Sequence, residues 1–325
     1  MQPVIIDDLK SLYLPPSDSH KGQNGRLLII GGSHLFHAAS LWALKVASRI
    51  VDLVHYSSVP ENNEIVQKAK EEFRDGIVVP RGDVESYIEE DDAILIGPGM
   101  VRTNNSKIKN QNAKLQFKIQ NLKELDEIED EGLQTEALTN YLLSKYPHKQ
   151  WVIDAGALQM VDIGLIPKNA ILTPHRGEFD RLWSKYMELN KESGIMNYGK
   201  EIELTDQIKL FAKRHQCIVL VKGEVDVVCN GGECDGRICV PGEYRQISGG
   251  NSGMTKGGTG DVLAGLIAAL ATKNDPFLAT TAGSYINKQA GDSLFKRVGP
   301  YFNASDLADE IPKVMKELFI KQTNP

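Results

Sequence analysis

The sequence predicts an α/β fold in which helices cover both faces of a central, mostly parallel β-sheet. Two observations lead to this prediction. Short runs rich in β-branched residues recur along the chain with helix-like segments between several of them, as is typical of parallel strands joined by crossover helices. A chain of 325 residues is also long enough for such a fold to bury a sizeable core as one unit. We therefore expect a single domain, residues 1–325.

The alternating part of the chain supplies the sheet. The expected strands are residues 26–30, 53–56, 77–79, 93–96, 151–153 and 218–221. The expected helices between them are residues 38–51, 135–146 and 205–215, the last with Thr205 as its N-cap. Residues 225–240 contain the pair Gly231-Gly232 and predict a hairpin.

Two regions differ from this alternation. The stretch of about 103–132 is dense in Lys, Asn, Gln and Glu, and we interpret it as a polar, mobile insertion that is exposed to solvent. After residue 260 the pattern is entirely helical. The expected helices there are residues 262–272, 276–295 and 304–319, with Ser305-Asp306 at the start of the last one.

The composition limits the partners of the protein. Lys and Arg number 37 against 43 Asp and Glu, and the net charge of -6 argues against a general nucleic-acid or anionic membrane surface. The apolar run 262–271 is far shorter than the roughly 18–20 residues that cross a bilayer. The N-terminus lacks a signal-like segment. We expect a cytoplasmic protein without nucleic-acid or membrane partners.

The four cysteines, at positions 217, 229, 234 and 239, form no CxxC pair and have no histidine at zinc-finger spacing. We interpret them as buried or strand thiols and assign no metal to them.

Residues 248–270, SGGNSGMTKGGTGDVLAGLIAAL, place six glycines ahead of Asp261 and an apolar helix-like run. Glycines allow backbone N–H groups to approach a ligand closely, and a helix N-terminus adds free donors and a positive dipole end, which together make an anion hole. The simpler interpretation is that Asp261 only caps the helix. A cap needs one polar residue, however, and does not explain six glycines. We also expect the helix N-terminus to lower the pKa of Asp261.

Two commoner phosphate motifs are excluded. GIMNYGK, residues 194–200, has Walker A spacing but is followed by Glu201 and is not preceded by a strand. The dinucleotide fingerprint GxGxxG fails after both Gly97-Pro98-Gly99 and Gly258-Thr259-Gly260.

The remaining GGTGD motif is one of five. They are HKGQNGRLLIIGGS (20–33), ILIGPG (94–99), VIDAGAL (152–158), LTPHRGEF (172–179) and NSGMTKGGTGDVLAG (251–265). In these motifs and their order the sequence resembles the ribokinase-like superfamily and, within it, the ADP/ATP-dependent NAD(P)H-hydrate dehydratases. The resemblance covers nearly the whole chain apart from residues 103–132, and it implies a ribokinase-like, three-layer α/β/α fold.

The resemblance implies a metabolite-repair lyase. Its substrate would be the S-epimer of hydrated NADH or NADPH. The enzyme would phosphorylate the ring hydroxyl with ADP or ATP and Mg²⁺, after which the ring nitrogen expels phosphate. We favour ADP as the donor. The resemblance also suggests a homo-oligomer.

The resemblance assigns roles to named residues. Asp261 would be the general base, with Gly258 and Gly260 holding the transferring phosphoryl group. The implied nucleotide-binding residues are Lys222, Gly223, Glu224, Val225, Asp226, Gly257, Gly258, Thr259 and Gly260. The implied substrate-binding residues are Ala39, Gly97, Gly99, His175 and Asp261.

Structural explanations stay open for several of these residues. Glu178 is a candidate to hold Mg²⁺ and equally a candidate helix cap. Lys222 fits a surface lysine at a strand end, and His175 fits a turn residue. Gly97 and Gly99 fit an ordinary tight turn. Asp154 ends a strand where α/β sheets place ligands, yet it also fits a cap of the next helix.

The chain departs from the family pattern at three places. Met100-Val101 follow Gly99 where the family has GPGLG, Ala38 replaces a glycine, and Asn287 replaces a histidine. These differences leave room for an altered substrate or weakened activity. We expect no N-terminal epimerase domain, since the chain begins close to the first motif.

Two other functions remain as alternatives. The first is a small-molecule kinase of the same superfamily, for a sugar, hydroxyethylthiazole or hydroxymethylpyrimidine. The motifs TPHRGE and HKGQNG argue against it. The second is a non-catalytic nucleotide-binding module.

Overall fold

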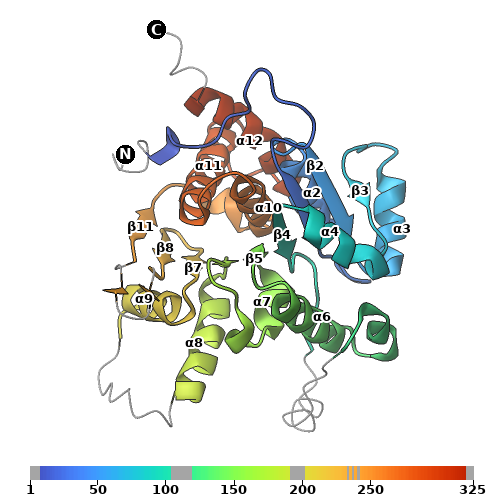
Figure 1. Ribbon diagram of the computed structural model, residues 1–325. Coiled ribbons are helices and arrows are strands. Elements are labelled where there is room, and N and C mark those ends of the chain that lie inside the picture. Colours follow the sequence, from blue (N-terminus) through green and yellow to red (C-terminus); the bar gives the residue numbers. More distant parts are fainter. Residues whose placement is uncertain are drawn as a thin grey trace.

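The structure is a computed structural model that describes residues 8–103, 119–190, 202–232, 234–235, 238–239 and 242–319 (Figure 1). The Walker-like segment 194–200 and residues 104–118 of the polar stretch lie outside these residues.

One large sheet forms the centre of the molecule. In the described part of the chain it has nine strands in the order β11-β8-β7-β6-β5-β4-β1-β2-β3. The strands are β1 (Arg26–Ile30), β2 (Leu53–Ser57), β3 (Ile77–Val78), β4 (Ala93–Ile96), β5 (Gln150–Ile153), β6 (Ile171–Leu172), β7 (Ile218–Val221), β8 (Asp226–Asn230) and β11 (Tyr244–Ile247). β1 to β7 are parallel to one another, and β8 pairs antiparallel with both of its neighbours, β7 and β11. β9 (Cys234–Asp235) and β10 (Ile238–Cys239) form a separate antiparallel pair.

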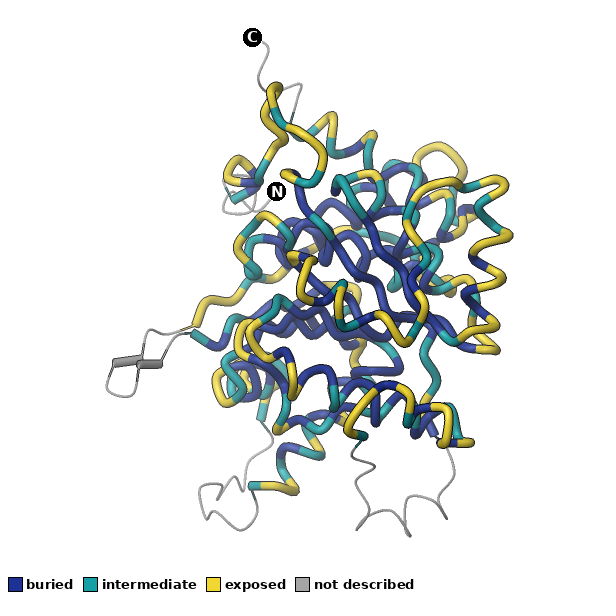
Figure 2. Tube along the Cα trace, turned by 45° about the vertical axis from the view of Figure 1, so that its right-hand side comes forward, coloured by how far each residue is buried: buried dark blue, intermediate teal, exposed yellow. Residues whose placement is uncertain are grey.

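The central strands are buried on both faces, as β1 shows. Leu27 and Ile29 belong to one hydrophobic core, whereas Leu28 and Ile30 belong to a second core on the opposite face. Because successive side chains of a strand point to opposite faces, a strand with a core on each side is apolar throughout. The buried strands form the dark blue centre of Figure 2. This explains why β1 was recognisable as a continuous apolar run.

Helices form the two outer layers (Figure 1). One core packs helices α2 (Ala38–Ala47), α3 (Pro60–Ala69), α10 (Thr259–Ala271), α11 (Pro276–Val298) and α12 (Ala304–Phe319) against the sheet. The other packs α4 (Val84–Glu90), α6 (Glu131–Lys145), α7 (Ala155–Met160), α8 (Arg176–Asn190) and α9 (Leu204–His215). The predicted three-layer arrangement is confirmed. None of the described helices is both long and apolar enough to cross a membrane.

Two predicted helix starts were wrong. α10 begins at Thr259, so Asp261 lies inside its first turn and not ahead of it. The N-cap of α9 is Glu203, which places Thr205 within the helix. α12 spans Ala304–Phe319 as predicted, and the side chain of Asn303 accepts the amides of Ser305 and Asp306 at its start.

The hairpin predicted over residues 225–240 also differs from the structure. β8 pairs with β7 and β11 in the main sheet, and only the short strands β9 and β10 pair with each other. In the polar stretch, residues 119–132 are folded onto the core, where Leu122 and Leu125 are buried. Of the four cysteines, Cys217 and Cys229 are buried free thiols as expected.

Several elements were not predicted, namely β6, β11, α3, α4, α7 and α8. β6 has only two residues, too few to form a recognisable run. The sequence of α8 is rich in charge, but it carries a buried stripe of Phe179, Leu182 and Tyr186 at helical spacing.

The strand order reverses between β1 and β4. β2 and β3 lie on one side of β1, and β4 to β7 lie on the other. In open α/β sheets ligands bind in the crevice outside the carboxyl ends of the strands at such a reversal. Gly31 follows β1 and Gly97 follows β4, so the first two sequence motifs meet at this crevice.

We expect Gly265→Ala to reduce the free energy of unfolding by about 1–3 kcal/mol. Its Cβ would lie 2.6 Å from the Cα of Ala43, where α10 packs against α2. Urea denaturation followed by tryptophan fluorescence measures the loss. Gly82→Ala is the control, because a Cβ there meets nothing within 4 Å. Equal stability of the two variants would contradict this close packing.

Candidate active site

The glycine-rich loop enters α10 without a side-chain cap. Gly258 is the N-cap, with a φ of 95°, and a Cβ there would come within 2.3 Å of the Trp42 ring, so only glycine fits. The Thr259 hydroxyl donates back to the loop and lies 2.7 Å from the Met254 carbonyl and 2.9 Å from that of Lys256. The conformation of the loop is thus fixed by contacts within the chain.

The first amides of α10 are available to a ligand. In the described chain no group accepts a hydrogen bond from the amides of Gly257, Gly258 or Gly260, whereas the Asp261 N–H bonds its own carboxylate and the Val262 N–H donates to the Gly258 carbonyl. A helix N-terminus leaves such donors free and carries the positive end of the helix dipole. The predicted anion hole is consistent with this arrangement.

Asp261 lies half-buried in the first turn of α10. Burial, together with the nearby Asp154 carboxylate, raises the pKa of Asp261 to about 7, against the smaller opposing effect of Lys222. The expected lowering of this pKa by the helix N-terminus was wrong. Desolvation penalises the charged form directly, and the helix dipole does not compensate for it here.

Lys222 links three strand ends. Lys222 follows β7, and its amide donates to the carbonyl of Pro174, which follows β6, at 2.8 Å. Its Nζ lies 3.0 Å from Oδ1 of Asp154, which follows β5. Burial alone would lower the pKa of Lys222, but the carboxylates of Asp154 and Glu178 raise it. Lys222 therefore stays charged beside Gly260, where a Cβ would be 3.4 Å from its Nζ. Asp154 makes no capping bond to α7.

His175 and Glu178 cap the start of α8 reciprocally. The His175 Nδ1 accepts the amides of Gly177 and Glu178 at 3.1 and 3.3 Å, and Glu178 Oε2 accepts the His175 amide at 2.9 Å. Because Nδ1 is an acceptor, the neutral ring carries its proton on Nε2. The His175 side chain is 58% exposed and lines the cavity described next, and its Nε2 lies 3.6 Å from Oε1 of Glu178.

A cavity of about 750 Å³ lies over the loop and the start of α10. Seven of the residues singled out in the sequence line it: His175, Lys222, Gly223, Glu224, Asp226, Thr259 and Gly260. Val225 is not part of the lining and is exposed. The Asp226 carboxylate is occupied within the chain, since it binds the Gly223 amide, the Ser284 hydroxyl and the Lys288 ammonium.

Three residues that the resemblance places at the substrate lie at the crevice between β1 and β4, namely Ala39, Gly97 and Gly99. A Cβ at Gly97, which has a φ of 125°, would lie 1.8 Å from the Asp154 carbonyl oxygen. A Cβ at Gly99 would lie 3.1 Å from the Cβ of Ala39. The close packing of the chain therefore requires glycine at position 97, whatever ligand binds nearby.

Sequence reasoning missed the role of Lys288. This lysine is only 5% exposed, and its Nζ donates to the carbonyls of Gly223, Glu224 and Gly249 around the cavity. The available signal was that this lysine is the one charged residue in the sequence segment 282–291. Its neighbour Asn287, noted as a departure, lines the same cavity, and its Oδ1 has no partner within the described chain.

Most of the chain matches one family. A sequence profile described as NAD(P)H-hydrate dehydratase covers residues 27–313. The chain belongs to the NAD(P)H-hydrate dehydratase family. This confirms the resemblance drawn from the five motifs.

Two curated relatives illustrate the match. The chain is 31% identical over 317 residues to the ADP-dependent (S)-NAD(P)H-hydrate dehydratase of Nitrosopumilus maritimus, covering 92% of this chain and 91% of that protein. It is 33% identical over 319 residues to the bifunctional NAD(P)H-hydrate repair enzyme Nnr of Methanocaldococcus jannaschii, covering 95% of this chain and 52% of that protein. The chain thus spans about half the length of the bifunctional relatives it matches.

A solved structure supports the fold. The ADP/ATP-dependent NAD(P)H-hydrate dehydratase from Bacillus subtilis, co-crystallised with ATP and Mg²⁺, has a TM-score of 0.68 at 22% identity, covering 96% of this chain and 97% of that chain. The predicted ribokinase-like fold is confirmed.

We expect Asp261→Asn to raise the free energy of unfolding above pH 7. The pKa of Asp261 is about 7 in the folded chain and about 4 in an unfolded one. Between these values the folded state binds more protons, so it loses stability as pH rises, and asparagine escapes this loss. Urea denaturation should show a stability difference that grows from pH 4 to about 7 and then levels.

Asp206→Asn is the matched control for this measurement. Asp206 also lies in the first turn of a helix, α9, but it is exposed and pairs with Lys209 at 3.5 Å. We expect no such gain for this variant. A pH-independent effect of Asp261→Asn would show that its carboxyl is not desolvated.

Proposed function

We propose that this protein dehydrates the S-epimer of hydrated NADH and NADPH, using ADP or ATP to phosphorylate the ring hydroxyl. One observation carries the proposal. Asp261, with a pKa of about 7, stands next to free amides at a helix N-terminus and to the Lys222 ammonium. A base, an anion hole and a fixed cation are the groups that phosphoryl transfer to an alcohol needs.

Asp261 accepts the hydroxyl proton while the oxygen attacks the terminal phosphorus of the donor. A base with a pKa near the working pH combines a large ionised fraction with useful basicity, and such a group contributes roughly 10²- to 10⁴-fold. The pKa of about 7 suits this step better than that of an ordinary aspartate.

The amides of Gly257, Gly258 and Gly260 hold the transferring phosphoryl group. Charge spreads over its oxygens in the transition state, and donors fixed beforehand stabilise that charge without reorganising. The Lys222 ammonium adds a positive charge held in place by Asp154. The phosphorylated ring then breaks its C–O bond, because the ring nitrogen supplies the electron pair and phosphate leaves.

The 750 Å³ cavity takes the phosphoryl donor, since pockets of roughly 300–1,000 Å³ suit small ligands. Its floor is the loop 249–252, and Leu263 and Met254 add apolar surface for a base. The name of the Nitrosopumilus maritimus relative supports ADP as donor, and that of the Bacillus subtilis protein supports either nucleotide.

The acidic residues of the site fit Mg²⁺ as a partner of the nucleotide. Asp154 keeps one carboxylate oxygen free of the Lys222 contact, whereas both oxygens of Glu178 accept hydrogen bonds from the chain. Mg²⁺ usually keeps several waters and is bound by one or two carboxylates together with phosphates. Asp154 directly and Glu178 through water would hold it. When bound, Mg²⁺ neutralises phosphate charge.

On the acceptor side, His175 offers its Nε2–H to the hydrated ring or its phosphate. Ala39 and Gly99 form the small-residue wall of the crevice between β1 and β4. Ala38, which replaces a family glycine, directly precedes Ala39 at the start of α2. The substrate therefore lies with its ring between this wall and Asp261.

We expect the purified protein to restore the absorbance of NADH from hydrated NADH when Mg²⁺ and ADP or ATP are present. Comparing the two nucleotides identifies the donor. Asp261→Asn should lower kcat by about 10²-fold or more while nucleotide binding persists, because the base is lost and the amides remain. Asp206→Asn should keep full activity. A phosphorylated product that accumulates would identify a kinase, and equal turnover of both variants would reject the mechanism.

We expect kcat/KM to rise with pH through about 7, with unit slope below it. Only the ionised form of Asp261 accepts the proton, and its pKa is about 7. Initial rates between pH 5.5 and 9 at saturating nucleotide measure the profile. A flat profile through pH 7 would show that another group takes the proton.

A further inference from the structure

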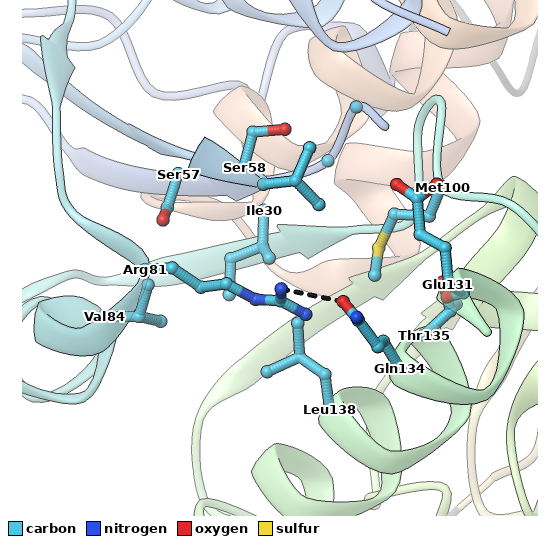
Figure 3. Close-up of a pocket in the computed structure, with 13 residues that line it drawn as sticks. Ile30, Ser57, Ser58, Arg81, Val84, Met100, Glu131, Gln134, Thr135 and Leu138 are labelled. Carbon is cyan, nitrogen blue, oxygen red and sulfur yellow. Dashed lines mark hydrogen bonds between the residues drawn. The ribbon is translucent and has the colours of Figure 1, made fainter. Parts of the chain in front are cut away.

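A second cavity, of about 20 Å³, lies at the carboxyl ends of β1 and β2 (Figure 3). We call it the Arg81 cavity. Ile30, Val84 and Leu138 form its apolar wall, and Arg81, Ser57 and Gln134 are among its polar residues. Gly31, Gly32 and Met100 also line it. Since these residues follow β1 and β4, the Arg81 cavity adjoins the crevice that holds the proposed substrate.

Arg81 brings more donors to the Arg81 cavity than the chain satisfies. Its Nη1 donates to Oε1 of Gln134 at 2.9 Å, and no Asp or Glu of the described chain forms an ion pair with it. Burial lowers the pKa of Arg81, and the more distant carboxylates of Asp126, Glu131 and Glu61 oppose this effect. An arginine remains protonated in proteins and has five N–H donors. Most of these donors therefore lack an acceptor.

Ser57 is the second polar group without a partner. Its residue is only 1% exposed, and no atom of the described chain bonds its Oγ. Figure 3 shows the Ser57 hydroxyl directed toward the beginning of the Arg81 side chain, whose guanidinium extends on to Gln134, whereas Ser58 points the other way. A buried hydroxyl without a partner destabilises the fold, because it has lost its hydrogen bonds to water. The position of the Ser57 hydroxyl in the same cavity as Arg81 suggests a bound group that the chain itself does not provide.

The other polar side chains of the Arg81 cavity are already occupied. Ser58 accepts from Asn62 at 2.9 Å, and Thr135 donates to the Glu131 carbonyl at 3.1 Å. The Glu131 carboxylate binds the amide and ring of His34. The unmet groups are thus a guanidinium, which can only donate, and one hydroxyl. Any occupant must supply acceptor atoms.

We propose that the Arg81 cavity is a phosphate subsite, in which Arg81 and Ser57 hold one oxygen of a phosphate group. Its volume fits a single water-sized atom at the bottom, so one oxygen enters while the rest of the phosphate stays at the mouth. Guanidinium groups match phosphate oxygens in both charge and geometry.

Two sources can provide this phosphate. One is the dinucleotide substrate, which carries a pyrophosphate and, in the hydrated NADPH form, a 2′-phosphate; this source rests on the proposed function. The other is free inorganic phosphate. Met100, which departs from the family pattern, directly follows Gly99 and lines the Arg81 cavity. The departure therefore lies beside the subsite.

Calorimetric titration of the full chain with NADP⁺, NAD⁺ and inorganic phosphate tests the subsite. The variants are Arg81→Met and Ser57→Ala. Arg49→Met is the matched control, because Arg49 pairs with Asp309 far from the cavity. We expect Arg81→Met to weaken phosphate binding about tenfold or more, Ser57→Ala to weaken it severalfold, and the control to bind as the wild type does.

The pattern of losses identifies the source. Weaker binding of NADP⁺ alone indicates the 2′-phosphate, and equal losses for both dinucleotides indicate the pyrophosphate. A loss for inorganic phosphate alone indicates the free ion. Unchanged binding of all three ligands in the folded Ser57→Ala and Arg81→Met variants overturns the proposal and leaves the cavity to water. Should Arg81→Met fail to fold by circular dichroism, Ser57→Ala decides.

Turnover of hydrated NADH by the wild type is measured in parallel. No turnover refutes the proposed function, yet the inorganic phosphate titration still tests the subsite. Normal turnover with unchanged phosphate binding in the variants refutes only the subsite.

Discussion

Lys222 and Asp154 meet at 3.0 Å where β7 and β5 end, with the short strand β6 between them. The Asp154 charge is buried and would be costly alone, whereas Lys222 is half-buried, so the pair requires the three strand ends to be aligned. The same two residues set the charge around Asp261, one raising its pKa and the other lowering it. The electrostatics of the site therefore depend on the register of this sheet.

The sequence allowed the ends of β1, β4 and β7 to be predicted to the residue, because each is an apolar run bounded by polar or glycine residues. β6 could not be recognised, since two residues carry no periodicity, although its motif LTPHRGEF was noted. The starts of α9 and α10 were misplaced because several polar residues at each N-terminus compete as caps, and structure alone decides among them.

The candidate site was predictable in its residue types but not in its energetics. Glycine spacing indicated free amides beside Asp261, whereas the pKa depends on burial, which no local motif reveals. Asp226 was expected at the nucleotide, yet its oxygens hold the turn after β7 and Lys288. Contacts between distant segments, such as Lys288 with Gly249, arise only from the folded chain.

Trp42 lies one turn after Ala39 on α2, and its ring fills the space beside Gly258 while its indole N–H bonds the Ser305 hydroxyl. A single helix thus touches the proposed acceptor wall at one end and the proposed phosphoryl hole one turn later. In the proposed reaction any displacement of α2 would move both walls together, so one element would set the distance between the attacking oxygen and phosphorus. Precision in that reaction geometry would then follow from the packing of one helix and not from a hinge.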